Sequence, residues 1–208
     1  MITETLIENP PMVTAASRVR TELSERAVST AAITPARVAL WVVLASVTML
    51  FAGFASAYLV RRSASDWVPI YAPSILWWST AALLASSLAL EKTKAVQQKS
   101  THSSFRAWIL ASVALGLAFV VGQITAWRDL SAMGIFLPTS PHSSFFYMLT
   151  GVHAAHVLGG VVLLLWLLGR EWRAPLVTSG EALSLAATYW HFVTGIWIFL
   201  YLLLFAWR

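Results

Sequence analysis

Five long apolar runs follow a polar stretch at the beginning of the chain. Each run is close to the roughly 20 residues that an α-helix needs to cross a bilayer. None alternates between apolar and polar positions, as the strands of a membrane barrel do. We therefore predict an all-α, polytopic membrane protein with five transmembrane helices in one bundle over residues 36–208. The predicted helices cover residues 36–60, 71–90, 105–127, 144–168 and 183–207.

Residues 1–35 mix acidic and basic side chains and contain no apolar run behind a basic segment. That pattern predicts a polar N-terminal tail, partly disordered, and no cleaved signal peptide.

The composition excludes several classes of protein. Hydrophobic residues make up 58% of the 208 residues and charged residues 11%, with a mean hydropathy of +0.71. A soluble domain carries about 25% charged residues, so a soluble globule, a disordered chain and a nucleic-acid-binding domain are all excluded. The net charge of +5 then indicates basic residues at the membrane surface. The chain has no Cys, hence no disulfide and no thiolate metal site.

Lys and Arg are divided unevenly between the two sides of the predicted bundle. Ten lie on the side of the N-terminal tail and four on the other, which places the N-terminus in the cytoplasm and the C-terminus in the periplasm. The ten are Arg18, Arg20, Arg26, Arg37, Lys92, Lys94, Lys99, Arg106, Arg170 and Arg173, and the four are Arg61, Arg62, Arg128 and Arg208.

Few strongly polar residues lie deep in the runs, and none of them is Asp, Glu, Lys or Arg. His153 and His156 are three residues apart, so they share one face of their helix. His191 lies on the last predicted helix and Gln123 on the third. If the last two helices pack as a hairpin, we expect the three imidazoles to lie near one another at mid-depth.

Two interpretations of these histidines remain open. Imidazole is a common ligand of metals and haem, but an i, i+3 pair without a partner carboxylate is weak as a metal site. We favour a structural role, in which neutral imidazoles bond to neighbouring groups or to a lipid headgroup. His102 and His142 lie in predicted loops, where we expect them to be solvated.

Three segments resemble subunit III of the haem–copper oxidases. Residues 146–160 read Phe-Tyr-Met-Leu-Thr-Gly-Val-His-Ala-Ala-His-Val-Leu-Gly-Gly, and residues 188–197 read Thr-Tyr-Trp-His-Phe-Val-Thr-Gly-Ile-Trp. The first predicted helix, from residue 40 to residue 58, is similar to the same family. These matches stand in the family's order and cover about residues 36–208. Five helices match the shorter bacterial form, which lacks the first two helices of the seven-helix form.

The resemblance implies an accessory subunit without a catalytic centre. Subunit III packs on subunit I, in a complex with subunit II and small subunits. It carries no haem or copper, supports proton uptake, limits turnover inactivation and holds phospholipids in a cleft. We therefore expect no catalytic, metal or cofactor residue here, bound phospholipid, haem and copper in partner subunits, and a place in the bacterial inner (cytoplasmic) membrane. A respiratory supercomplex with a quinol-oxidising complex is a further possible assembly.

Two sets of candidate residues follow. The structural or lipid-facing polar residues inside the membrane are His153, His156, Trp190, His191 and Gln123. Basic residues at the predicted helix ends are candidates for contact with lipid headgroups. They are Arg61, Arg62, Arg106, Arg128, Arg170 and Arg173.

The chain departs from the family at two positions. Val47 stands where the family commonly has Glu, and Thr194 where it commonly has Asp. A role that depends on a buried carboxylate of subunit III is therefore in doubt for this chain.

Alternative functions differ in their electron donor or their class. Cytochrome c is the favoured donor, and subunit III of a quinol oxidase is the close alternative. A membrane b-type cytochrome would use His153 or His156 with His191 as axial ligands. A small-solute permease would need broken helices, internal repeats or midplane charges, and the sequence offers none of them.

Overall fold

The computed structural model describes residues 20, 34–70, 72–97, 102–173 and 180–206. The chain divides into two units, Met1–Ala39 and Leu40–Arg208, which are described separately. Most of the predicted N-terminal tail lies outside the described residues, as do Trp207 and Arg208. In the first unit, Arg20 is helical and exposed, and the backbone carbonyl of Thr34 accepts hydrogen bonds from the amides of Arg37 and Val38 at the start of a helix.

Five long helices account for most of the described residues. They are α2 (Pro35–Arg62), α3 (Ile75–Gln97), α4 (His102–Ala132), α5 (Pro141–Arg173) and α6 (Gly180–Tyr201), the last followed by a π-helical turn, Leu202–Ala206. Four segments are long and apolar enough to cross a membrane: Pro35–Arg62, Ser104–Ala132, Pro141–Arg173 and Gly180–Phe205. The prediction of an all-helical, multi-pass membrane protein is confirmed to that extent. The span of α3 stays a prediction, because its hydroxyl residues and its charged last turns lower its hydropathy.

The helices extend beyond the predicted apolar runs. Arg61, Arg128 and Arg170 lie inside their helices, although we predicted that they follow them. Backbone hydrogen bonding continues past the last apolar residue, and a basic side chain near a helix C-terminus interacts favourably with the helix dipole. The second helix begins at Ile75, later than predicted, and continues through Glu91 to Gln97.

Local hydrogen bonds define two helix ends. The backbone amide of Ser140 donates to the hydroxyl of Ser143, whose own amide donates to the hydroxyl of Ser140. This reciprocal cap, with Pro141 at the first helical position, starts α5. At the end of α4, Gly134 has a φ of 77°, a conformation that glycine adopts without a steric penalty. The amide of Ile135 then donates to the carbonyl of Leu130 at 2.9 Å, which closes the last turn.

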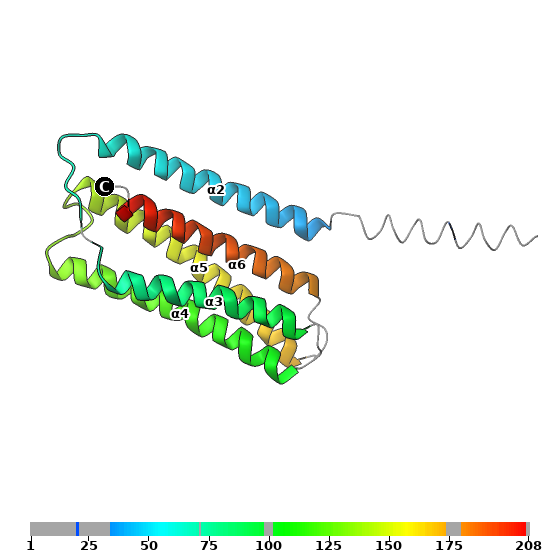
Figure 1. Cartoon of the computed structure of the whole chain (residues 1–208). Coiled ribbons are helices and arrows are strands. Elements are labelled where there is room, and N and C mark those ends of the chain that lie inside the picture. Colours follow the sequence, from blue (N-terminus) through cyan, green and yellow to red (C-terminus); the bar gives the residue numbers. More distant parts are fainter. Residues whose placement is uncertain (1–19, 21–33, 71, 98–101, 174–179, 207–208) are drawn as a thin grey trace, which may run out of the picture. The chain divides into compact units, whose positions relative to one another are not determined.

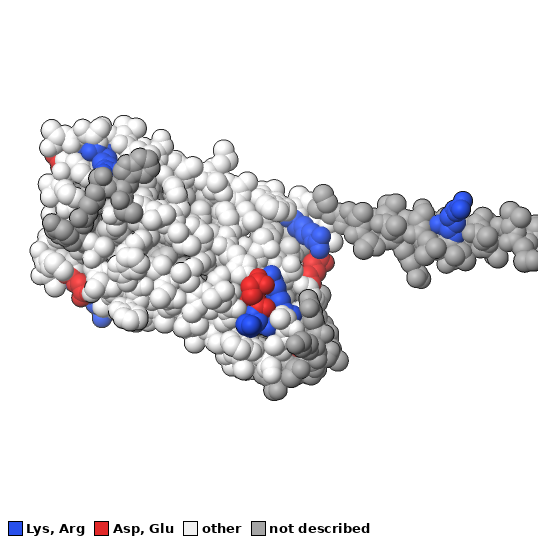
Figure 2. All heavy atoms as spheres, in the orientation of Figure 1, with Lys and Arg blue, Asp and Glu red and all other residues white. Residues whose placement is uncertain are grey.

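Four helices of the second unit form a closed ring around the core. α4 packs between α3 and α5, and α6 packs between α5 and α3 (Figure 1). Figure 2 shows that on one face of residues 40–208 the charged side chains gather at two ends, with uncharged surface between them. An uncharged belt between charged ends is typical of a bundle that spans a bilayer.

α2 is attached to this ring mainly through aromatic side chains on one face. The Phe51 ring lies 5.6 Å from the His156 ring, centroid to centroid. Two turns further on, Tyr58 packs edge-on against Trp67 at 5.1 Å and Phe145 at 5.6 Å. The opposite face of α2 exposes large apolar side chains such as Trp41 and Met49, which suits lipid or another subunit.

Candidate functional site

Trp190 of α6 fills a close contact among the four helices of the ring. A Cβ atom added at Gly116 of α4 or at Gly160 of α5 would lie 2.8 Å from carbon atoms of the Trp190 ring. The indole N–H donates to the Ser86 hydroxyl at 3.1 Å, and that hydroxyl donates to the carbonyl of Ser112 at 2.7 Å. Trp190 therefore joins α3, α4, α5 and α6, because small residues on two helices leave room for its ring.

Two other buried or half-buried tryptophans also bond between helices. Trp197 of α6 donates its indole N–H to the hydroxyl of Thr80 on α3 at 2.9 Å. Trp127 of α4 donates to the hydroxyl of Thr150 on α5 at 3.0 Å. Each indole N–H is thus paired with a hydroxyl, because an unpaired polar group in apolar surroundings is energetically costly.

His153 and Gln123 are fully buried at 0% exposure. The His153 ring stacks on Trp197 at 5.1 Å between centroids and meets the edge of Phe119 at 5.6 Å. Neither ring nitrogen of His153, and neither polar atom of the Gln123 amide, has a hydrogen-bond partner among the described residues.

His156 lies one turn after His153, against α2. Its Nδ1 lies 2.8 Å from the carbonyl oxygen of Val152, which makes this nitrogen the protonated donor. The Tyr189 hydroxyl of α6 donates to the His156 backbone carbonyl at 3.1 Å. The residue therefore contributes both its side chain and its backbone to helix contacts.

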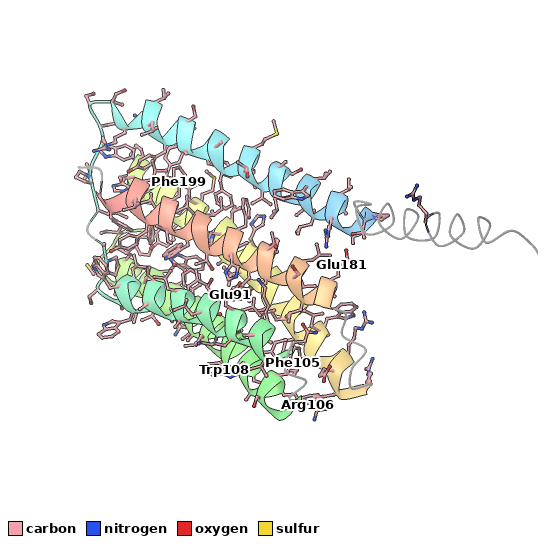
Figure 3. The ribbon with its side chains drawn as sticks, turned by 45° about the vertical axis from the view of Figure 1, so that its right-hand side comes forward. Glu91, Phe105, Arg106, Trp108, Glu181 and Phe199 are labelled. Atoms are coloured by element: carbon pink, nitrogen blue, oxygen red, sulfur yellow. The ribbon has the colours of Figure 1, made fainter. Side chains whose placement is uncertain are left out.

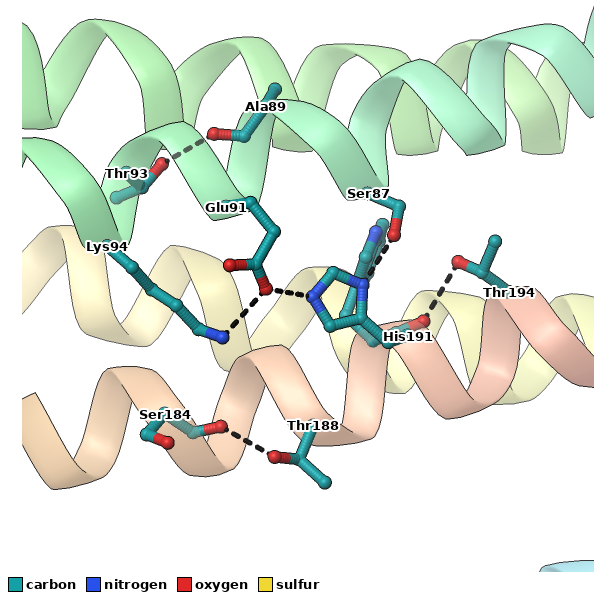
Figure 4. Close-up of polar contacts among 10 residues, drawn as sticks. Ser87, Ala89, Glu91, Thr93, Lys94, Ser184, Thr188, His191 and Thr194 are labelled. Carbon is teal, nitrogen blue, oxygen red and sulfur yellow. Dashed lines mark hydrogen bonds and ion pairs between the residues drawn. The ribbon is translucent and has the colours of Figure 1, made fainter.

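His191 faces α3, where it joins a chain of polar groups (Figure 4). Its Nε2 lies 2.5 Å from Glu91 Oε1, and its Nδ1 lies 2.5 Å from Ser87 Oγ. Because a carboxylate only accepts, Nε2–H is the donor to Glu91, while Nδ1 shares a hydrogen bond with the Ser87 hydroxyl. Lys94 donates to the same Oε1 at 2.7 Å.

The structure thus separates the histidines that the sequence grouped. His153 and His156 both lie against Phe51, whereas His191 is bonded to two residues of α3. Glu91 is a polar residue of this region that the sequence analysis missed, since it comes directly after the predicted helix 71–90. Its spacing of i+4 from Ser87 and i−3 from Lys94 was the available signal.

Val47 and Thr194, the two positions at which we expected a departure from the resemblance, are both buried. Val47 is 7% exposed and packs in the core from α2. Thr194 is 4% exposed, and its hydroxyl donates to the Trp190 carbonyl one turn earlier.

Both histidines that we placed in loops lie in helices, and our expectation that His142 is solvated is wrong. His142 lies in the first turn of α5 and is 2% exposed. Its ring stacks on Trp67 at 4.9 Å, and its Nδ1 accepts the backbone N–H of Ile70 at 3.0 Å. The segment between α2 and α3 folds over this ring, which the hydropathy pattern could not indicate. His102 is the first residue of α4.

The candidate arginines occupy both ends of the helices. Arg106 donates to the Glu171 backbone carbonyl at 3.5 Å, and Figure 3 shows it at the opposite end of the bundle from Phe199. The Arg170 guanidinium lies 4.9 Å from the centroid of the Trp166 ring. Arg128 and Arg173 are exposed, and Arg62 is partly exposed. Arg128 also lines a surface pocket of about 280 Å³ with Trp127 and Tyr147.

Arg61 forms a bidentate ion pair with Asp66, with one hydrogen bond of 2.7 Å and one of 2.5 Å. Hydrogen bonding to this guanidinium lowers the pKa of the Asp66 carboxyl below its ordinary value. Its charge is therefore matched within the chain, which leaves Arg61 a weaker headgroup candidate than an unmatched arginine.

Long apolar helices, charges confined to the bundle ends and polar side chains that bond across helix contacts define a polytopic helical membrane protein. The family "Cytochrome c oxidase subunit III" matches residues 28–208. A probable cytochrome c oxidase subunit 3 of Mycobacterium tuberculosis (strain ATCC 25618 / H37Rv) is 31% identical over 164 residues, covering 76% of this chain and 81% of the relative.

Two further relatives, each named cytochrome c oxidase subunit 3, are similar over comparable lengths. The protein of Thermostichus vulcanus is 31% identical over 175 residues, 80% of this chain and 84% of the relative. That of Synechocystis sp. is 33% identical over 170 residues, 78% of this chain and 71% of the relative. The chain belongs to the cytochrome c oxidase subunit III family, and so to an oxidoreductase complex with other oxidase subunits. The resemblance found in the sequence is thereby confirmed.

Proposed function

We propose that this chain is the accessory, non-catalytic subunit III of a respiratory haem–copper oxidase in a bacterial inner membrane. In this role it spans the membrane five times, with the N-terminus in the cytoplasm, and packs on subunit I. The observation that carries the proposal is that polar side chains inside the bundle form hydrogen bonds between its helices. The indole groups of Trp127, Trp190 and Trp197 each bond a hydroxyl on a neighbouring helix, so this chemistry holds helices together.

The bonding of His191 favours this role over a b-type cytochrome. An axial ligand presents a free ring nitrogen to iron, but both nitrogens of His191 are engaged, with Ser87 and with Glu91. Ligation would break at least one of these bonds. Of the two candidate partners on α5, His153 is enclosed by the rings of Trp197 and Phe119. His156, the other, donates from Nδ1 to the Val152 carbonyl.

The exposed apolar surface supports a role in assembly and lipid binding. The apolar window of α2 is 22% buried within the chain, against 39–44% for the windows of α4, α5 and α6. Subunit I and phospholipid tails would cover the remaining apolar face of α2. Phospholipid headgroups would contact arginines at the helix ends, Arg128 and Arg173 above all, since both are exposed.

The electron donor of the whole complex is proposed to be cytochrome c. The names of the three relatives, each a cytochrome c oxidase subunit 3, support this donor over quinol. Haem and copper would lie in the partner subunits, and a supercomplex with a quinol-oxidising complex is compatible with this assignment. Support of proton uptake would act through subunit I, because the deep segments of this chain carry no Asp or Glu.

Affinity purification of the tagged chain from its own membranes tests the proposal. Subunit I, identified by its haem spectrum and mass, should co-purify, and cytochrome c oxidation should accompany it. Expressed without its partners, the chain should aggregate or be degraded and should show no haem bands. A monodisperse isolated chain with haem bands would contradict the accessory role and support the cytochrome alternative.

A further inference from the structure

Gln123 and His153 present a set of buried polar atoms that the protein itself does not satisfy. Both residues are 0% exposed, in the middle of α4 and of α5. The amide oxygen and nitrogen of Gln123 and the two ring nitrogens of His153 have no hydrogen-bond partner among the described residues. Such groups are almost always paired in folded proteins, with protein or with ordered water.

Contacts on both sides of Gln123 direct it toward α5. Phe119, one turn before it on α4, meets the His153 ring at 5.6 Å. Trp127, one turn after it, bonds the hydroxyl of Thr150 on α5. Residues four apart share a helix face, so Gln123 lies on the strip of α4 that faces Thr150 and His153.

The neighbouring polar groups are already engaged elsewhere. The Thr150 hydroxyl accepts from Trp127 and donates to the Phe146 carbonyl. The indole N–H of Trp197, which stacks on His153, donates to Thr80. Full burial also keeps lipid headgroups and side chains of other subunits away from both residues.

The occupant of this site must therefore be small, neutral and able both to donate and to accept hydrogen bonds. No Asp, Glu, Lys or Arg occurs in residues 107–127 or 144–168, so a bound ion would lack a counter-charge. The Gln amide offers donors and an acceptor, and a neutral imidazole offers one of each. Water matches this set, and the three rotatable bonds of Gln123 allow its amide to turn toward it.

We propose that Gln123 and His153 bind a buried water molecule between α4 and α5, a hydrated site within the apolar bundle. Only residues of this chain form the site, and the proposal does not depend on the proposed oxidase function. Hydration completes the hydrogen bonding of both side chains, as buried waters generally do.

The test uses the protein in the membrane complex with which it purifies. At a resolution that shows ordered water, density should lie within hydrogen-bonding distance, about 3 Å, of both the Gln123 amide and a His153 nitrogen. Infrared spectra should also show a water O–H stretch that shifts on exchange into H₂¹⁸O. Direct bonding of the amide to the imidazole without intervening density would overturn the proposal, as would the absence of an isotope-sensitive band.

Variants provide a second measurement. Gln123→Leu and His153→Leu should each lower the fraction of complex that is recovered after heating. The double variant should lower this fraction no further than either single variant, because it leaves no polar group unpaired. The infrared band should disappear from Gln123→Leu. Ser112→Ala on the same helix is the matched control: in the double variant with Gln123→Leu, the two fractional losses of recovered complex should multiply. If the losses of Gln123→Leu and His153→Leu also multiplied, the two residues would not share a water.

Discussion

His153 and His191 lie on adjacent helices of the same bundle, yet their surroundings are opposite. His153 is enclosed by aromatic rings, with no exposure and no bonded partner among the described residues. His191 is about a third exposed and bonds Glu91 and Ser87 through its two nitrogens. The comparison shows that ring packing surrounds His153 at the enclosed centre of the bundle, whereas hydrogen bonds and a carboxylate surround His191 where it meets α3.

The largest effect is expected when the ring at the enclosed centre is removed. Trp190→Ala deletes a side chain that is 2% exposed and packs on Gly116 and Gly160, and should cost about 3–5 kcal/mol. The melting temperature of the purified complex measures this loss. Trp78→Ala, at a tryptophan that is 75% exposed, is the matched control and should change the melting temperature little. Equal decreases in melting temperature for both variants would mean that the packing of Trp190 contributes no more stability than an exposed tryptophan does.

The two adjacent glycines of α5 give the next largest contrast. A Cβ at Gly160 would meet the Trp190 ring at 2.8 Å, whereas a Cβ at Gly159 would have only an ordinary contact of 3.8 Å with the Tyr189 hydroxyl. Gly160→Ala should therefore destabilise the bundle by about 1–3 kcal/mol. Gly159→Ala should be neutral or stabilising, because alanine favours a helix over glycine. Thermal denaturation of both variants decides the matter, and the reverse order would refute the close packing at Gly160.

A smaller effect is expected at the α3–α6 contact. Glu91→Gln keeps an oxygen that accepts from His191 but removes the charge that pairs with Lys94. Since the Glu91 side chain is 48% exposed, the loss should be below about 1 kcal/mol and should shrink as salt rises. Lys94→Gln should reproduce most of it, as a salt series of melting temperatures would reveal. A loss as large as that of Trp190→Ala would show that charge governs this contact more strongly than its exposure implies.

The smallest effect concerns the exposed ion pair between Arg61 and Asp66. The pair lowers the pKa of Asp66 in the folded protein, so its stabilisation is present above the ordinary pKa of Asp. It is lost as the pH falls through the lowered value. Acid titration of the melting temperature should thus be shallower in Asp66→Asn than in the unchanged chain. Identical acid slopes would show that the pair contributes nothing.

The sequence predicted the helices well and the placement of polar residues less well. Long uncharged runs correctly indicated α2, α4, α5 and α6, because backbone groups in a bilayer must be satisfied within the helix. Helix ends were misplaced, since apolar runs end at the edge of the membrane and helical hydrogen bonds do not. His142 and Glu91 were misjudged because a chain segment folds over the first, and a histidine 100 residues away bonds the second.

Hydropathy, spacing and the two motifs by themselves determined the class of protein, its family and the helices that carry His153, Trp190 and His191. Only the tertiary structure decided that Trp190 fills a space between two glycines, that His153 and Gln123 are enclosed, and that His191 turns toward Glu91. The period of a helix fixes which residues share a face. Which neighbour that face meets depends on how the helices rotate and pack in the bundle, and that rotation follows from the fit of side chains on several helices at once.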